Sequence, residues 1–543
     1  MRVSVFVAST ILLLTSCAPN NDATNTNWSS SVVHTTSGLS KTSVQINNNG
    51  NILLVWQETE SKVSPDTDKN ATLKNTNPDA TFQYMDLFTR STIHSMHYVA
   101  SSDSWSSDTT ITTGFWQKAK VGTLDNQYSN DNSKIVYDEV NPTFDGDLSI
   151  AINKNGDALA AWVQLAESTQ TTGDAGTQHQ IFYSQYTSSS ATWSTATEIT
   201  PPANRVIKNE VKVGLSADNT AKVVYLALDS STGKTNVYSA NYDGKTFTYT
   251  SPPELSDGTS DTKQIRINQL GDSVGVVTWL QSVDTGTSIV DVLYSRWFNS
   301  SGWNSAPVSV SSATSTINAY STSKNTSGDF WAVAEQSSAI GSATNAIIAY
   351  HFTGDITSAL TNGTWSTGTS IQSGGSTSGM SDAQIAVDGN GNVLATWLDP
   401  SDTIFTSGLN LFPSNSIRAN SYSKSSGWQV SSFLVTTNTV LKNISTKDEQ
   451  YGIRFNDVRV ASTADNTFII NWQSAPGRIN GTASKMYSVT YDSVTNTLSE
   501  AALINTNQVL EVTQKDLLVA NGNVQLFWTS SNNGKTDFIT SKP

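Results

Sequence analysis

The sequence predicts an all-β fold, a β-propeller of eight four-stranded antiparallel blades. Three observations support this prediction: a hairpin-like segment recurs eight times, two tryptophan positions recur with it, and the two chain ends hold complementary parts of one repeat. The composition agrees, because only 14% of the residues are charged. The other polar residues are mainly Ser, Thr, Asn, Gln and Gly, which suit strands and tight turns.

The recurring segment is a short apolar strand, a turn rich in Asn, Asp and Gly, and a second apolar strand that ends in an aromatic residue. In four copies a turn glycine precedes a tryptophan by six residues: Gly50 and Trp56, Gly156 and Trp162, Gly391 and Trp397, and Gly522 and Trp528. Weaker copies end at Tyr225, Trp279 and Trp472. The remaining copy has Ala334 in the aromatic place, where we expect Trp331 to supply the missing bulk. Gly and Asn tolerate the positive φ of hairpin turns, so each copy predicts two strands, A and B.

A second half follows each hairpin. It begins with an alternating strand, such as IFYSQY from Ile181 or KMYSVTY from Lys485. A turn then often leads to a tryptophan that starts a short polar strand, at Trp105, Trp193, Trp303, Trp365 and Trp428. Each repeat therefore holds four strands, A to D. We expect nearly all of these tryptophans to be apolar wedges between neighbouring sheets.

The last repeat lacks strand D, and the missing strand is present at the other end of the chain. Asn27-Trp28-Ser29-Ser30-Ser31-Val32 matches the D pattern. Pairing this strand into the last blade would close the ring and remove an exposed sheet edge. Residues 27–543 are therefore predicted to form one propeller, with seven blades as the alternative if the fifth copy is misassigned. The pattern resembles the propeller-repeat class, including sialidase-like and NHL-type repeats, although the sialidase Asp-box is absent.

The N-terminus has the features of a secretion signal. One Arg precedes an apolar run from Val3 to Leu14, which is too short to span a bilayer and is typical of a signal peptide. Leu14-Thr15-Ser16-Cys17 resembles the lipobox of bacterial lipoproteins. The resemblance implies that residues 1–16 are removed, that Cys17 is acylated, and that residues 17–26 tether the domain to the membrane. Because Ala18 is not Asp, it also favours the outer membrane of a bacterial cell envelope.

Long connections are expected on one face of the propeller. Loop insertions are predicted at about 58–90 and 106–140 in blade 1, with further long loops at Asp399–Asn415 and Val430–Phe455. In a four-stranded meander the B–C and D–A connections emerge on the same face. We therefore expect a protein or glycan ligand at this loop-rich face or at the mouth of the central channel. The alternative is that the insertions are polar spacers.

No convincing catalytic or metal-binding set is found, and no cofactor is expected. His94 and His97 are three residues apart on a strand and should face opposite sides. Asp66, Asp68 and Asn70 resemble the start of a calcium loop but lack its glycine and closing glutamate.

Charged residues near the channel are the candidates for a glycan-cleaving site, which needs two carboxylates. Arg266 and Arg459 lie on predicted A strands, and Glu210, Asp382 and Asp457 lie near the starts of A strands. We interpret them as solvated strand ends. Arg and carboxylate side chains that converge at the channel mouth would instead favour cleavage.

Two functions remain open. The main hypothesis is a membrane-anchored surface or periplasmic lipoprotein whose propeller is a protein- or glycan-binding or scaffold module. The alternative is a glycan-cleaving enzyme of sialidase-like propeller type. The formal net charge of −14, without any basic block, argues against nucleic acid as a partner.

Overall fold

The computed structural model describes most of the chain beyond residue 27. The described residues are 28–65, 67–77, 80, 82–114, 117–125, 136–140, 146–165, 179–249, 254–325, 327–373, 378–400, 415–436, 453–476, 485–504, 512–520, 523–532 and 535–542. Cys17, the signal peptide and the tether lie outside these residues, as does Gly522. No helix in the described part of the chain is long and apolar enough to cross a membrane.

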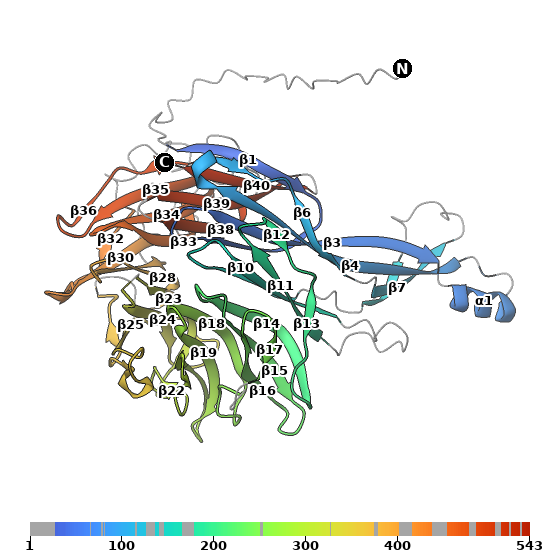
Figure 1. The fold of residues 1–543 in the computed structure, drawn as a ribbon, viewed down its shortest axis with the longest axis horizontal. Coiled ribbons are helices and arrows are strands. Elements are labelled where there is room, and N and C mark those ends of the chain that lie inside the picture. The colour runs from blue at the N-terminus through green and yellow to red at the C-terminus, as the bar shows by residue number, and fades with distance from the viewer. Residues whose placement is uncertain are drawn as a thin grey trace, which may run out of the picture.

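The described strands form eight antiparallel sheets arranged as the predicted propeller (Figure 1). The eight inner strands are β2 (Leu39–Ile46), β9 (Leu148–Ile152), β14 (Arg205–Leu215), β18 (Thr262–Gly271), β23 (Thr316–Lys324), β28 (Ser381–Val387), β33 (Ile453–Ala464) and β38 (Val512–Ala520). Each inner strand contacts the inner strands of both neighbouring blades, and β38 contacts β2. The fifth copy forms a blade like the others, which excludes the seven-bladed alternative.

The second and third strands of each blade are long and largely buried. The second strands are β3 (Ile52–Pro65), β10 (Ala158–Leu165), β15 (Ala221–Asp229), β19 (Val274–Asp284), β24 (Phe330–Ser337), β29 (Val393–Asp399), β34 (Thr467–Pro476) and β39 (Asn523–Asn532). The third strands are β4 (Phe82–Val99), β11 (His179–Thr187), β16 (Lys234–Tyr242), β20 (Ile289–Asn299), β25 (Ala346–Thr353), β30 (Ser416–Ser423), β35 (Lys485–Asp492) and β40 (Lys535–Lys542).

The outer strand is divided into two short pieces in six blades. The first pieces are β5 (Ser104–Trp105), β12 (Thr192–Trp193), β21 (Gly302–Trp303), β26 (Thr364–Trp365), β31 (Gly427–Trp428) and β36 (Thr497–Leu498). The second pieces are β6 (Thr109–Thr113), β13 (Thr197–Ile199), β22 (Val308–Ser309), β27 (Thr369–Ser370), β32 (Phe433–Leu434) and β37 (Ala502–Leu503). Blade 3 has β17 (Phe247–Thr248), and short 3-10 turns lie at Ala100–Ser102 and Leu360–Asn362.

The N-terminal strand closes the ring, as the sequence predicts. β1 (Ser29–Thr36) is the outer strand of blade 8 and pairs antiparallel with β40, from Ser29 opposite Lys542 to Thr36 opposite Thr536. Trp28 is buried in the same cluster as Trp528 and Ile539. The first and last described segments therefore share one sheet, and no outer edge of blade 8 is left open.

The recurrent aromatic residues fill the interfaces between blades. Each aromatic residue at the end of a second strand lies in a cluster shared with the preceding blade; Trp162 packs with Leu53 and Ile93 of blade 1. The tryptophans of the outer strands join the same interfaces, and Trp193 donates a hydrogen bond to Ser95 Oγ of blade 1 at 2.8 Å. The wedge interpretation is therefore the one that the packing supports.

The expectation that Trp331 replaces the missing tryptophan of blade 5 is wrong. Trp331 and Ala334 are three residues apart on β24, so their side chains face opposite sides of the sheet. Trp331 packs into the interface with blade 6. The interface with blade 4, which Ala334 faces, is filled instead by Tyr320 and Tyr350.

Blade 1 carries an arm of regular structure where the sequence predicts loop insertions. β3 and β4 pair without interruption from Ile52 opposite Tyr98 to Pro65 opposite Met85. Helix α1 (Thr67–Thr76) joins them, β7 (Gln117–Asp125) pairs with β4, and β8 (Val136–Val140) pairs with β7. Figure 1 shows this arm extending away from the ring, with α1 near its tip. Much of residues 58–90 and 106–140 is therefore strand.

The described side chains of the candidate calcium and histidine sites make structural contacts. The Asn70 amide binds the backbone of Tyr84, with Nδ2 donating at 2.9 Å and Oδ1 accepting at 2.6 Å. The side chains of Asp66 and Asp68 lie outside the described residues. His94 stacks on Trp56 at 5.3 Å, whereas His97 packs against Tyr186 of blade 2 at 5.9 Å. The two histidines therefore face opposite sides, as predicted.

Candidate functional site

The channel mouth at which the inner strands begin, here called the loop-bearing mouth, is held by carboxylates that reach from one blade to the next. Glu210 on β14 accepts hydrogen bonds from two backbone N–H groups of blade 4, at 2.7 Å from Ile265 and 3.1 Å from Gln264. Asp382 on β28 accepts one at 2.6 Å from Val458 of blade 7. Both receiving strands are bulged at these places. Two of the candidate carboxylates, interpreted from the sequence as solvated strand ends, therefore join neighbouring blades.

The same contact recurs around the mouth. Asp147 accepts a hydrogen bond from the Val211 N–H at 3.2 Å, and Glu335 accepts one from the Ala383 N–H at 2.9 Å. Burial raises the pKa of Glu210 and of Glu335. A carboxylate that accepts backbone N–H groups in this way compensates the donors that each bulge leaves without a partner in its own sheet.

Three of the predicted candidates do converge, between blades 6 and 8. Arg459 on β33 lies 2.7 Å from Asp457 and 3.7 Å from Asp382. Sequence reasoning missed the fourth member, Lys515 on β38, whose ammonium donates to the backbone carbonyl of Asp457 and lies 3.7 Å from its carboxylate. Arg266 stands apart from this cluster, because its guanidinium donates to the Tyr320 carbonyl at 3.1 Å and stacks on the Tyr320 ring.

Lys515 is expected to make the free energy of unfolding depend on pH. Its side chain is fully buried, and this burial, partly offset by Asp457, lowers its pKa from 10.5 to about 8. Between these two values the unfolded chain binds more protons than the folded protein, so the free energy of unfolding rises with pH through this window. We expect the free energy of unfolding of the wild type, relative to that of Lys515→Met, to rise by about 3 kcal/mol from pH 7.5 to pH 10.5. Urea unfolding at both pH values measures it, and parallel pH profiles would contradict it.

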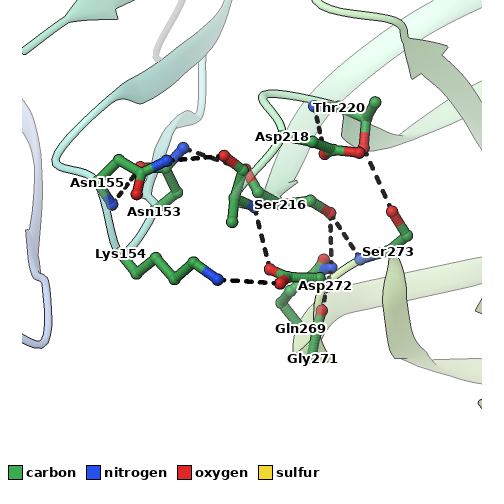
Figure 2. Close-up of polar contacts among 11 residues, drawn as sticks. Asn153, Lys154, Asn155, Ser216, Asp218, Thr220, Gln269, Gly271, Asp272 and Ser273 are labelled. Atoms are coloured by element: carbon green, nitrogen blue, oxygen red, sulfur yellow. Dashed lines mark hydrogen bonds and ion pairs between the residues drawn. The ribbon is translucent and has the colours of Figure 1, made fainter.

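At the opposite end of the channel, here called the turn mouth, a side chain at the tight turn of blades 2, 3, 5 and 6 links it to the next blade. Asn153 Oδ1 accepts hydrogen bonds from the Asn155 and Asp157 N–H groups, at 2.9 and 3.1 Å, while its Nδ2 donates to the Ser216 carbonyl of blade 3 at 3.1 Å. Figure 2 shows this contact and its continuation. There Ser216 Oγ accepts from the Ser273 N–H of blade 4 at 2.9 Å.

Several of the turns share one backbone conformation, with a positive φ at the same position. Gly50 and Gly391, predicted to allow positive φ, have values of 79° and 80°. Asn219 and Asn466 occupy the same place in blades 3 and 7, both with φ of 65°. The opening residue precedes the aromatic position by nine residues in several blades, as in Asn47, Asn153, Asn325 and Asp388. This constant spacing could have identified, from the sequence, the residues that open the turns.

The turn mouth opens into a cavity of about 700 Å³, lined by the ends of all eight inner strands. Its wall combines aliphatic residues with amide side chains, among them Gln45, Asn47, Asn268 and Gln269, and the charged side chains Lys154, Lys324 and Asp465. Asn47 is 4% exposed, and its Oδ1 accepts from the Asn49 and Asn51 N–H groups at 3.0 Å each. The amide nitrogens of Asn47 and Asn268 are buried and have no hydrogen-bond partner in the described part of the chain. Both nitrogens are enclosed by protein atoms, so a ligand reaches them only if their side chains move.

A groove of about 460 Å³ lies beside the cavity, between blades 3 and 4. Gln269 lines both hollows. Lys222, Asn241 and Phe298 form the part of the groove wall that carries a charge over an aromatic ring, with the Lys222 ammonium 5.6 Å from the ring centre. The sequence predicts a ligand at the opposite, loop-rich face or at the mouth of the central channel. Asp399–Asn415 and Val430–Phe455 on that face lie largely outside the described residues.

Within the described residues, no group of three or more His, Cys, Asp or Glu side chains is placed to hold a metal ion. The two mouths thus differ in chemistry. The loop-bearing mouth holds charged side chains engaged with one another and with backbone. The turn mouth holds a polar cavity with two amide donors that lack partners.

No protein-family model matches the chain, and no curated protein sequence matches it. Among solved structures it is similar to the polysaccharide lyase Uly1, with 8% identity and a TM-score of 0.41 over 76% of this chain and 93% of that one. It is also similar to the Penicillium chrysogenum alpha-L-arabinanase complexed with arabinobiose, with 12% identity and a TM-score of 0.33 over 60% and 87%. The Trypanosoma rangeli sialidase in complex with sialic acid matches with 10% identity and a TM-score of 0.29 over 76% and 56%. Likenesses at this level carry no information about substrate.

Proposed function

We propose that the chain is a carbohydrate-binding β-propeller and that its ligand enters the cavity at the turn mouth. The observation that carries this proposal is the amide-lined cavity of about 700 Å³, a volume within the range of small-ligand sites. Sugar hydroxyls both donate and accept hydrogen bonds. The Asn and Gln side chains of the wall offer both functions.

The two amide nitrogens without partners strengthen the proposal. A buried donor left unsatisfied costs about 1–3 kcal/mol, so Asn47 Nδ2 and Asn268 Nδ2 favour a ligand that supplies acceptors. The donors come from blades 1 and 4, on different sides of the ring. A sugar that reaches both would be held across the channel.

A lipid anchor would place this module at a membrane. The lipobox-like segment before Cys17 supports acylation there, and the polar residues 18–26 would give the propeller reach from the membrane. We propose that the protein is held at the bacterial outer membrane in this way. Mass spectrometry of the purified membrane form tests it, with Cys17→Ser as the variant that should be released into the soluble fraction.

The binding proposal is tested on a glycan array with the double variant Asn47→Asp/Asn268→Asp. This change keeps the oxygen of each side chain, and so the turn contacts of Asn47, but replaces each donor with an acceptor. We expect affinity for the best neutral oligosaccharide to fall at least about tenfold, which is the loss of roughly one hydrogen bond to a buried donor.

The control variant is Asn209→Asp, which adds one negative charge at an exposed residue of the loop-bearing mouth. It should bind like wild type. Wild-type affinity in the double variant would place the ligand elsewhere, and the absence of any glycan binding would refute the proposed function.

Glycan cleavage is the second candidate, and the convergence of Arg459 with Asp382 and Asp457 favours it. Two carboxylates beside an arginine can supply an acid and a nucleophile or base for glycoside chemistry. The discriminating measurement is the release of new reducing ends from glycans that bind on the array. Cleavage that is lost in Asp457→Asn would establish an enzyme, whereas binding without release would leave a binding module.

A further inference from the structure

Among the residues that the structure describes, two lysines at the turn mouth have no carboxylate partner. The Lys324 ammonium, which faces the central cavity, donates to the backbone carbonyl of Gln269. The Lys222 ammonium, which lines the groove between blades 3 and 4, donates to Asn241 Oδ1 and lies over the Phe298 ring. In the described part of the chain no carboxylate oxygen lies within 4.0 Å of either ammonium.

Several other lysines are paired with carboxylates. Lys154, which also lines the cavity, lies 3.2 Å from Asp272, and Figure 2 shows this ion pair. Lys263 lies 2.8 Å from Asp291, and Lys424 lies 2.8 Å from Asp329. The chain has 45 acidic residues against 31 Lys and Arg, so carboxylates are plentiful. Asp218 and Asp243 also line the groove, and Asp465 lines the cavity. Asp218 and Asp243 accept hydrogen bonds within their own turns, from Thr220 and Thr246, and neither pairs with Lys222 in the described part of the chain.

The surroundings make these charges costly. Loss of solvent lowers the pKa of Lys222, which is partly buried, and of Lys324, which is exposed to the cavity that protein surrounds. A partly desolvated ammonium is stabilised when an anion pairs with it. A ligand that carries negative groups supplies the pairing that the protein withholds.

The two lysines lie on either side of Gln269, which separates the cavity from the groove. Gln269 borders both hollows, its carbonyl accepts from Lys324, and its side-chain Nε2 donates to Ser216 Oγ at 3.1 Å. Ser216 in turn lines the groove that holds Lys222. A short chain molecule that passes from the cavity into the groove would therefore meet one ammonium on each side of Gln269.

Resting on the proposed carbohydrate-binding function, we propose that the ligand is an anionic glycan, a short oligosaccharide with carboxylate or sulfate groups that pair with Lys324 and Lys222. The net charge of −14 opposes long polyanions at a distance. Such repulsion is screened beyond about 8 Å at physiological ionic strength, so a short ligand inside the hollows is influenced mainly by the charges that line them, which include these two ammonium groups. The amides of the cavity wall bind its hydroxyls.

The test is a glycan array of uronate-containing and sulfated oligosaccharides, each beside its carboxyl-reduced or desulfated counterpart, probed with the purified protein. We expect the tightest ligand to be acidic and its neutral counterpart to bind about tenfold or more weakly, as expected for loss of a charge-assisted hydrogen bond. The two kinds of neutral counterpart identify which anionic group is recognised.

Variants then locate the charges. Lys222→Gln and Lys324→Gln should each weaken the acidic ligand about tenfold and leave its neutral counterpart unchanged. Lys263→Gln removes a lysine that is already paired with Asp291 and lines neither hollow, so it should change neither. Equal losses for acidic and neutral ligands would show a structural role and overturn the proposal.

The outcomes separate this inference from the proposed function. If neutral oligosaccharides bind as tightly as acidic ones and the cavity variant Asn47→Asp/Asn268→Asp weakens both, the anionic ligand is refuted and the carbohydrate function stands. If no glycan binds, both fail.

Discussion

Replacing Ser30 and Ser541 with cysteine is expected to produce a disulfide that locks the propeller ring and raises its melting temperature strongly. The two residues are directly opposite in the pairing of β1 with β40, and their hydroxyl oxygens are 2.7 Å apart. The bond would enclose nearly the whole described chain. The chain-entropy relation for loops of this length gives about 6 kcal/mol, although loss of the hydrogen bond from Trp528 Nε1 to Ser541 Oγ reduces the gain.

The measurement compares thermal unfolding before and after reduction, in a Cys17→Ser background that removes the natural thiol. The control pair is Ser30→Cys with Thr540→Cys, one residue out of register. Neighbouring residues of a strand point to opposite faces, so this pair should not form a disulfide. A disulfide in the control pair but not in the test pair would refute the register, and no disulfide in either would refute closure by β1.

Ring closure could be predicted because it left two traces in the sequence. The last repeat stops without strand D, and a D-like segment with Trp28 stands before the first repeat. The eight hairpins could also be predicted, because the turn glycine and the tryptophan keep a constant spacing. Both signals are local patterns that recur, and the fold repeats them in space.

The arm of blade 1 could not be predicted in the same way. Its strands Ile52–Pro65 and Phe82–Val99 are the second and third strands of blade 1, and both are longer than the corresponding strands of the other blades. The polar residues between them, SPDTDKNATLKNTNPD, favour a spacer by composition. Pairing of β3 with β4 along their full length, and of β7 with β4, decides the structure, and such pairing between distant segments has no periodic signal within either segment.

The roles of the charged candidates depended on contacts between blades. Glu210 and Asp382 were identified as channel residues, but their partners are backbone N–H groups of the next blade. Those groups become available only because β18 and β33 are bulged there, which residue types alone do not reveal. Lys515 and the lysines of the turn mouth were missed for the same reason, since the sequence shows a charge but not what surrounds it.

Trp279→Ala is expected to lower the free energy of unfolding by about 3–5 kcal/mol, the usual range for removal of a buried aromatic side chain. Trp279 is fully buried between blades 3 and 4. It packs with Val224, Leu226 and Phe298, and its indole N–H donates to Gln281 Oε1 at 3.3 Å. The deletion would leave a cavity that two rigid sheets cannot close, and the remaining amide of Gln281 would lose a partner.

Trp193→Ala is the matched comparison, because Trp193 lies at the other recurrent tryptophan position and is only half-buried on the outer strand β12. Its loss should cost about half as much, since the hydrophobic contribution scales with the area removed from water. Urea unfolding of both variants at neutral pH measures the two values. Equal costs would mean that the outer tryptophans hold the blades together as firmly as the inner ones. A cost below about 1 kcal/mol for Trp279→Ala would mean that the blade interface does not depend on its aromatic wedge.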